Sequence, residues 1–220
     1  IMKALKADAN RDLDALSYLQ FNNTPLRYAS STTTGGGGGS GLSTTGTATF
    51  TNSQAFATTH WKHIIDIMRE RNIPFYTNSD YVAIGWPTTF RNVKNTLETL
   101  HSYTETGLQL VFNGEIGRYE QTRVVEQTNI PKGGAGNSTT YDALNNTADA
   151  WDSATSDWIF FIGEEPVIEG IAVPMEVRAK IPTDYGRSKG VAWYWLGGYA
   201  SVRAASDTDN WNVVKWDSAA

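Results

Sequence analysis

The spacing of apolar positions predicts three helices in the first half of the chain. Over residues 1–21, apolar side chains recur every three or four positions between charged ones, which is the period of one helical face. Residues 53–72 repeat this period with an aromatic and branched stripe, and a third helix starts near Thr88. Between the second and third helices, residues 80–86 read as a short strand that ends before Pro87.

After about residue 107 the pattern changes from helices to strands. Runs of β-branched and aromatic residues predict strands at 108–112, 122–128, 158–162, 167–174, 177–181 and 191–202. No helical period interrupts the last four runs, so we expect them to form an antiparallel sheet. Helices first and strands later indicate an α+β fold without a repeated βαβ unit.

Two polar stretches separate these predicted elements. Residues 30–47 are rich in Ser, Thr and Gly and contain five consecutive glycines at 35–39. Such a composition buries too little apolar surface to order itself, so we expect a loop. The polar residues 131–157 are predicted to form a long surface loop or insertion.

The glycine-rich stretch also fits a nucleotide-binding spacing formally. Gly36, Gly38 and Gly41 match G-x-G-x-x-G, but no predicted strand precedes them and no helix opens on them. A run of glycines matches that pattern trivially. We therefore predict a linker here and no phosphate site.

Composition narrows the class of protein. A net charge of −5 without a basic stripe argues against sequence-specific DNA binding. The chain has no cysteine, so disulfides and cysteine-based metal or redox sites are excluded. No apolar run approaches the length of a membrane-spanning helix, and we expect no membrane partner. The 8 Trp, 10 Tyr and 8 Phe residues suit both a core and subunit interfaces.

Candidate catalytic and metal-binding groups are few. His60 and His63 share one helix face, with Asp66 three residues further on, but the spacing is not H-E-x-x-H, so packing is favoured over a metal site. Glu164 and Glu165 are adjacent, and neighbouring strand residues point to opposite faces, so they do not form a glycosidase pair. We predict no catalytic residue, no metal and no cofactor.

A strand near the C-terminus is apolar on both faces. Trp193, Trp195 and Tyr199 alternate on one side, while Tyr194 and Leu196 lie on the other. Sugar-binding sheets present aromatic platforms, so a carbohydrate-binding surface is one interpretation. A strand apolar on both faces is usually covered on both, and we favour a core and interface role.

Three stretches, taken in order, carry a resemblance to a known family. They are Phe112-Asn113-Gly114-Glu115-Ile116-Gly117-Arg118-Tyr119 followed by Arg123-Val124-Val125-Glu126; Gly163-Glu164-Glu165-Pro166 before a strand; and Tyr185-Gly186-Arg187 with Val191-Ala192-Trp193-Tyr194 and Gly197-Gly198-Tyr199. Together they resemble the major capsid proteins of N4-like tailed phages, which have the HK97 shell fold. The resemblance covers residues 1–203 approximately and rests on the order and spacing of these motifs.

This resemblance implies an α+β subunit with a peripheral domain, made of a spine helix and a long antiparallel sheet, and an axial domain. On this chain the implied division is a spine-type helix at 1–30, a Gly/Ser/Thr-rich loop at 31–52, a mainly axial part at 53–107, return strands at 108–130, an insertion loop at 131–157 and the peripheral sheet with the C-terminus at 158–220. The family's N-terminal arm and extended loop are expected upstream of Ile1.

The function that the resemblance implies is structural. Many copies in pentamers and hexamers form an icosahedral head around phage double-stranded DNA, with scaffolding, portal or decoration proteins as further partners. The subunit is then assembled in the host cytoplasm, resides in the virion and is not an enzyme. The expected subunit contacts are Glu115, Arg118, Arg123, Tyr185, Arg187 and Trp193.

Two alternatives remain open from the sequence. A carbohydrate-binding or tail-associated adhesin domain predicts an exposed aromatic strip. A nanocompartment shell protein of the same fold assembles as a capsid does, and only the motifs favour the phage shell over it.

Overall fold

The structure, a computed structural model, describes residues 2–30, 40–46, 55–77, 79–101, 118–127, 158–180, 190–203 and 211–216. In these parts the chain is a mixed α+β protein. Its helices are α1 (Met2–Asn22), α2 (Thr58–Glu70) and α3 (Arg91–His101). Its strands are β1 (Arg27–Ser30), β2 (Ser40–Ser43), β3 (Tyr81–Gly85), β4 (Arg118–Tyr119), β5 (Thr122–Glu126), β6 (Ile159–Ile162), β7 (Val167–Ala179), β8 (Val191–Ser201) and β9 (Val213–Trp216).

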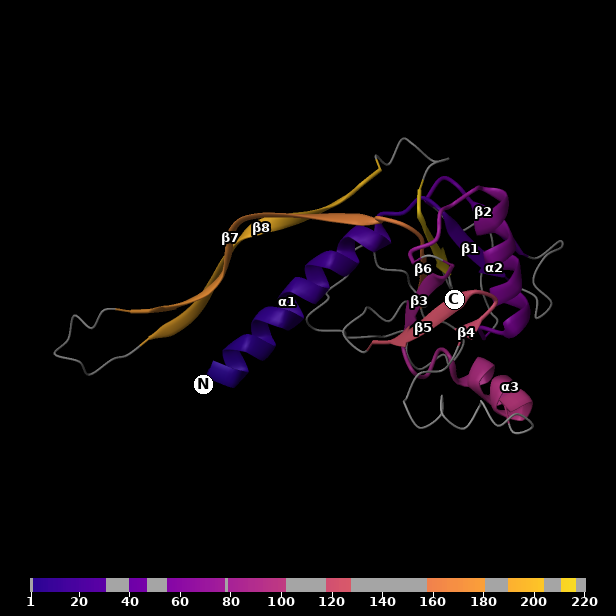
Figure 1. The fold of residues 1–220 in the computed structure, drawn as a ribbon, viewed down its shortest axis with the longest axis horizontal. Coiled ribbons are helices and arrows are strands. Elements are labelled where there is room, and N and C mark those ends of the chain that lie inside the picture. Colours follow the sequence, from indigo (N-terminus) through magenta and orange to yellow (C-terminus); the bar gives the residue numbers. More distant parts are fainter. Residues whose placement is uncertain are drawn as a thin grey trace.

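Seven strands form one mixed sheet in the order β2-β1-β9-β6-β3-β5-β4. The pairs β1/β9 and β3/β5 are parallel, and the other neighbours are antiparallel. Strand β9, from the end of the chain, therefore lies between β1 and β6 (Figure 1). This seven-stranded sheet joins both halves of the sequence into one unit.

Helix α2 covers one face of the seven-stranded sheet. Its Trp61, Ile64 and Ile65 are fully or almost fully buried in a cluster that also contains Phe161 of β6 and Trp216 of β9. Aromatic rings dominate this cluster, which makes it the principal core.

The C-terminal half of α1 covers the opposite face. Tyr18 is buried against Trp158, Phe160, Ile162 and Val213. Desolvation by burial, assisted by the nearby Asp14 charge, raises the pKa of Tyr18 to about 12. The helix is therefore anchored to the sheet by an apolar contact.

A buried lysine strengthens this attachment. Lys215 of β9 is fully buried, and its Nζ lies 3.4 Å from the centre of the Trp158 ring. The same ammonium donates to Asn22 Oδ1 at 2.5 Å, at the last residue of α1. Just beyond, Thr24 Oγ1 donates to the carbonyl of Val213 at 2.6 Å. The end of α1 is thus fixed to β9 by polar as well as apolar contacts.

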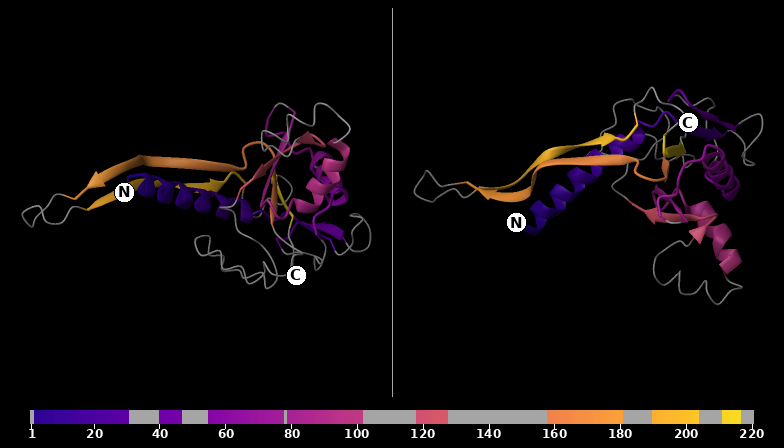
Figure 2. Two further views of the ribbon diagram at one scale, coloured as in Figure 1. Left: turned by 90° about the horizontal axis from the view of Figure 1, so that it is seen from below. Right: turned by 45° about the horizontal axis from the view of Figure 1, so that its top comes forward.

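Strands β7 and β8 form a separate antiparallel hairpin that extends away from the seven-stranded sheet, and α1 runs along one of its faces (Figures 1 and 2). We call α1 and this hairpin the arm. The register of the hairpin shifts between Ile171 and Val173 and again between Val173 and Glu176. These irregularities lie around Pro174, which cannot donate a ladder hydrogen bond.

The three predicted helices and the strands at 80–86, 122–128, 158–162 and 191–202 are confirmed within a few residues at their ends. The two strands predicted at 167–174 and 177–181 are one strand, β7. The strand predicted at 108–112 and the loop at 131–157 lie outside the described residues.

The expectation of one antiparallel sheet over residues 158–202 is wrong. Strand β6 pairs with β3 and β9 in the mixed sheet, while β7 and β8 stand apart. All four residues of β6 are buried, which requires a strand inside a sheet that is covered on both faces. A two-stranded hairpin offers no such place.

The expectation that residues 31–52 form only a loop is also wrong in part. Strand β2 pairs antiparallel with β1 over four residues, and Leu42 packs against the principal core. Pairing with an existing strand edge overrides the weak strand preference of Ser and Gly, because the backbone hydrogen bonds do not depend on the side chains. The glycines at 35–39 lie outside the described residues.

The principal core yields a test of stability. Replacing Phe161 by Ala removes a fully buried ring that lies 6.0 Å from both Phe56 and Trp61, measured between ring centroids. We expect the free energy of unfolding in urea to fall by about 3–5 kcal/mol. The control Val125→Ala, on a side chain 44% exposed, should change it by less than about 0.5 kcal/mol. Equal effects would contradict the assignment of the core.

Candidate interaction surface

The six residues expected at subunit contacts do not form one cluster among the described residues. Glu115, Tyr185 and Arg187 lie outside the described residues. Arg118 and Arg123 are directly opposite each other in β4 and β5, whereas Trp193 is in β8 of the arm.

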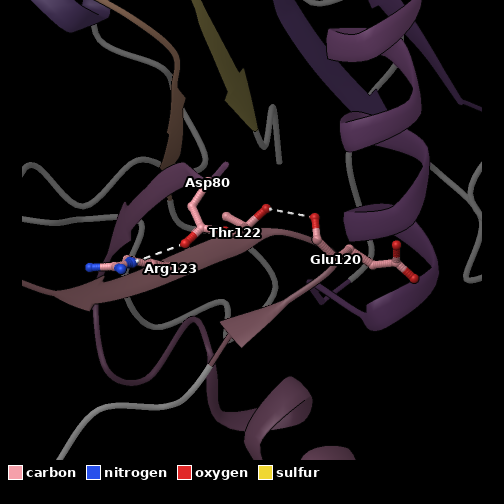
Figure 3. Close-up of polar contacts among 4 residues, drawn as sticks. All are labelled: Asp80, Glu120, Thr122 and Arg123. Atoms are coloured by element: carbon pink, nitrogen blue, oxygen red, sulfur yellow. Dashed lines mark hydrogen bonds and ion pairs between the residues drawn. The ribbon is translucent and has the colours of Figure 1, made fainter. Parts of the chain in front are cut away.

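Arg123 makes an ion pair within its own chain. Its Nε donates to Asp80 Oδ2 at 3.2 Å (Figure 3). The Asp80 side chain is only 5% exposed, whereas 55% of the Arg123 side chain is accessible. The pair therefore links β5 to the residue just before β3. Part of the guanidinium remains accessible, and a contact of Arg123 with another subunit stays a prediction.

The turn beside this pair has an unusual backbone. Glu120 and Gln121 have φ values of 48° and 57°, a left-handed conformation that two-residue hairpin turns require. Without glycine it costs about 1–2 kcal/mol per residue. Arg69 of α2 donates to Gln121 Oε1 at 2.7 Å. Figure 3 shows the second contact, in which Thr122 Oγ1 donates to the Glu120 carbonyl at 3.3 Å. These contacts hold the turn in place.

Trp193 belongs to the internal packing of the arm. It is half-buried, and its indole Nε1 donates to Asp8 Oδ2 of α1 at 3.3 Å. On the same face of β8, Trp195 stacks on Tyr199 with 5.9 Å between ring centroids. Tyr199 in turn donates its hydroxyl to Glu169 Oε1 of β7 at 2.9 Å. The aromatic side of β8 therefore faces α1, and a contact of Trp193 with a neighbouring subunit stays a prediction.

The rest of the arm exposes apolar side chains. The large ones, each between 37% and 56% exposed, are Leu16, Ile168, Ile171, Met175, Val177, Val191, Tyr194 and Leu196. Residues that pair across the hairpin share a face, so Ile171 and Val177 lie on the α1 side and Ile168 and Leu196 on the other. Both faces thus remain partly uncovered, which in a folded protein marks an interaction surface.

A groove of about 820 Å³ lies where the arm joins the seven-stranded sheet. Its lining includes the exposed Val125, Ile84 paired with it in β3, Tyr76 and Arg123. Its lining continues into the Gly163–Pro166 segment, which connects β6 to β7.

That connecting segment is tightly constrained. A Cβ on Gly163 would lie 2.6 Å from the Pro74 carbonyl oxygen, so only glycine fits there without a shift. Glu165 has a φ of 43° directly before Pro166, a conformation that sterics disfavour. The Glu164 and Glu165 side chains are exposed. This motif therefore acts as the junction between sheet and arm.

The two histidines of α2 serve packing. His60 is fully buried, and its Nδ1 accepts the Ala57 backbone N–H at 3.2 Å. His63 Nδ1 shares a 2.8 Å hydrogen bond with the Tyr28 hydroxyl. Across the part of the chain that the structure describes, no group of three or more His, Asp or Glu side chains is placed to hold a metal. No helix there is long and apolar enough to cross a membrane.

Comparison with known proteins found no matching family model, curated protein or solved structure. A functional assignment therefore depends on the geometry and the exposed surface of the arm.

Two adjacent glycines in β8 give a matched test of the arm. A Cβ on Gly197 would lie 2.5 Å from Trp195 Cζ2 and 2.6 Å from the Gly170 carbonyl oxygen, whereas one on Gly198 meets nothing within 4 Å. We expect Gly197→Ala to destabilise the hairpin by about 1–3 kcal/mol. Trypsin should then cleave after Arg178 and Lys180 at least about tenfold faster, since cleavage follows local opening.

Gly198→Ala is the control and should leave the cleavage rate close to that of the parent chain. Equal acceleration by both substitutions would contradict the described packing of Trp195 on β8.

Alkaline titration tests the Tyr199–Glu169 contact. Burial, the hydrogen bond to Glu169 and its charge together raise the pKa of Tyr199 to about 12 from 10.0. Because the folded pKa is raised, this contact stabilises the arm fully below pH 10 and is lost as the pH rises towards 12. The tyrosinate absorbance of the parent minus that of Tyr199→Phe should show one group ionising near pH 12. Ionisation near pH 10 would contradict the contact.

Proposed function

We propose that this chain is a shell-forming subunit, the major capsid protein of a tailed phage with an HK97-like fold. The observation that carries the proposal is the arm: a long helix and a long two-stranded hairpin that extend from a seven-stranded sheet and expose apolar side chains on both hairpin faces. A two-stranded hairpin is at best marginally stable in water without further packing. Among the described residues one helix covers only part of it, and in this proposal other copies of the chain cover the rest.

Within this proposal, the two parts of the structure are assigned to the two domains that the resemblance implies. We assign the arm to the peripheral domain, with α1 as the spine helix and β7–β8 as its long sheet. The seven-stranded sheet with α2 and α3 then corresponds to the axial domain. In this assignment β6 and β9 belong to the axial part, which changes the boundary expected from the sequence.

Charge supports contact between like chains over a nucleic-acid contact for the arm. Helix α1 contains three basic and three acidic residues, Lys3, Lys6, Arg11, Asp8, Asp12 and Asp14. Strand β8 contains none. Strand β7 adds Glu169, Glu176 and Arg178, so the charges of the arm nearly cancel. A surface with little net charge has neither the basic charge that phosphate binding needs nor a strong repulsion between identical copies. The shell would enclose DNA through its closed shape.

The adhesin alternative receives less support. A sugar-binding platform needs accessible aromatic rings, whereas Trp193, Trp195 and Tyr199 face α1 and are half-buried. The nanocompartment alternative shares the same subunit geometry and differs in what the shell encloses.

Electron microscopy of the gene product tests the proposal. Expressed alone or with a scaffolding partner, it should form closed shells or rings of five and six subunits, as heterologous contacts around closed rotations require. The material inside purified shells distinguishes DNA packaging from a protein cargo. Monodisperse monomers at high concentration would contradict the proposal, and glycan-array binding would then test the adhesin alternative.

A further inference from the structure

The charges of the arm are unequally distributed along its length. Its outer end, away from the seven-stranded sheet, contains the first turns of α1 and the end of β7 (Figures 1 and 2). The side chains there are exposed, and the charged ones are the basic Lys3, Lys6, Arg178 and Lys180 and the acidic Asp8 and Glu176. The outer end of the arm therefore carries a net positive charge.

The opposite end of the arm is acidic. Where β6 leads into β7, Glu164 and Glu165 are exposed and line the groove at the base of the arm. Arg123 also lines this groove, but the buried carboxylate of Asp80 balances its charge. Among the described residues that line the groove there is no further charged side chain, so the groove is negatively charged.

These two charged ends cannot meet within one chain. Strand β7 has 13 residues, so at about 3.3 Å per residue it separates Glu165 from Lys180 by roughly 40 Å. Helix α1 lies along the hairpin and is bonded to it through Asp8 and Trp193, which prevents the hairpin from folding back onto its own base. A partner for either end must therefore come from another molecule.

We propose that the outer end of the arm of one copy binds in the groove at the base of the arm of a second copy, with Lys180 paired to Glu164 or Glu165. This inference rests on the proposed function and adds to it a specific contact between subunits. Because the two surfaces differ, the contact is heterologous, and it repeats from copy to copy until a ring closes.

Apolar side chains at both surfaces support the same match. At the outer end, Val177 and Val191 are 49% and 38% exposed. In the groove, the exposed Val125 is paired with Ile84 of β3. Contact between these side chains, surrounded by opposite charges, gives the apolar centre and polar rim of a specific protein interface.

A second copy suits the outer end better than nucleic acid does. Phosphate binding depends on basic side chains, whereas the carboxylates of Asp8 and Glu176 lie among those of the outer end. Glu176 also accepts a hydrogen bond from Arg178 Nε at 2.6 Å, which reduces the positive charge available to phosphate. Phosphates would in addition leave the exposed Val177 uncovered.

Carbodiimide coupling tests the contact, because this reagent joins a lysine amine to a carboxylate only where the two groups touch. In the parent chain we expect an amide between Lys180 and Glu164 or Glu165, identified by mass spectrometry of the digested protein. Since β7 separates these residues, the link must join two copies. Lys180→Arg is the matched control: it keeps the charge and should keep the association, but it cannot form the link.

Charge reversal provides a second measurement that does not depend on the coupling reagent. Lys180→Glu and Glu165→Lys should each lower the associated fraction in analytical ultracentrifugation at least about tenfold, because like charges then oppose each other. The double variant should recover the association, since opposite charges meet again. Glu70→Lys, at an exposed position of α2, should leave the association unchanged.

No link from Lys180 to either glutamate, or a double variant that associates no better than the single ones, would overturn the inference. Duplex DNA that binds the parent chain but not Lys180→Glu, with no such link formed, would assign the outer end to nucleic acid instead. The outcome is separate from that of the proposed function. Shells that form without the link reject this inference alone, whereas linked dimers that never form rings or shells reject the capsid proposal and leave the contact.

Discussion

The whole structure depends on the way α1 is shared between two packing units. Its C-terminal half covers the second face of the seven-stranded sheet through Tyr18, and its final residue binds the buried Lys215. The rest of the helix runs along the hairpin, where Asp8 accepts the indole N–H of Trp193. One continuous helix thus fixes the direction of the hairpin relative to the sheet, because a helix resists bending far more than a loop does.

This constraint explains why the arm can extend so far while exposing apolar side chains. The sheet has a buried cluster on each face, and neither cluster contains a residue of β7 or β8. Along the hairpin, exposed apolar side chains extend from Ile168 beside the sheet to Val177 and Val191 at the outer end. A rigid arm with uncovered faces is the geometry that lattice contacts need, since the partner surface must be presented before binding.

The pattern of apolar and polar residues predicted those helices and strands whose formation depends on their own residues. The helical period of α1 and the aromatic and β-branched run of β8 each predicted its element, because both signals lie within the element itself. Strand β2 was missed since its Ser and Gly residues acquire order only through pairing with β1. The neighbours of β6 in the sheet could not be predicted either. A strand buried on both faces is a continuous apolar run, and such a run does not indicate which strands pair with it. Likewise, the sequence suggested Trp193 as a subunit contact. It could not show that the indole N–H of Trp193 donates a hydrogen bond to Asp8 of the same chain.

The central claim is that other copies of the chain cover the arm. Hydrogen–deuterium exchange in assembled particles, compared with the dissociated subunit, tests it most directly. We predict that the amides of β7 and β8 become strongly protected on assembly, while those of β3 and β6, already inside the seven-stranded sheet, change little. Hairpin amides that exchange equally fast in both states would contradict the account.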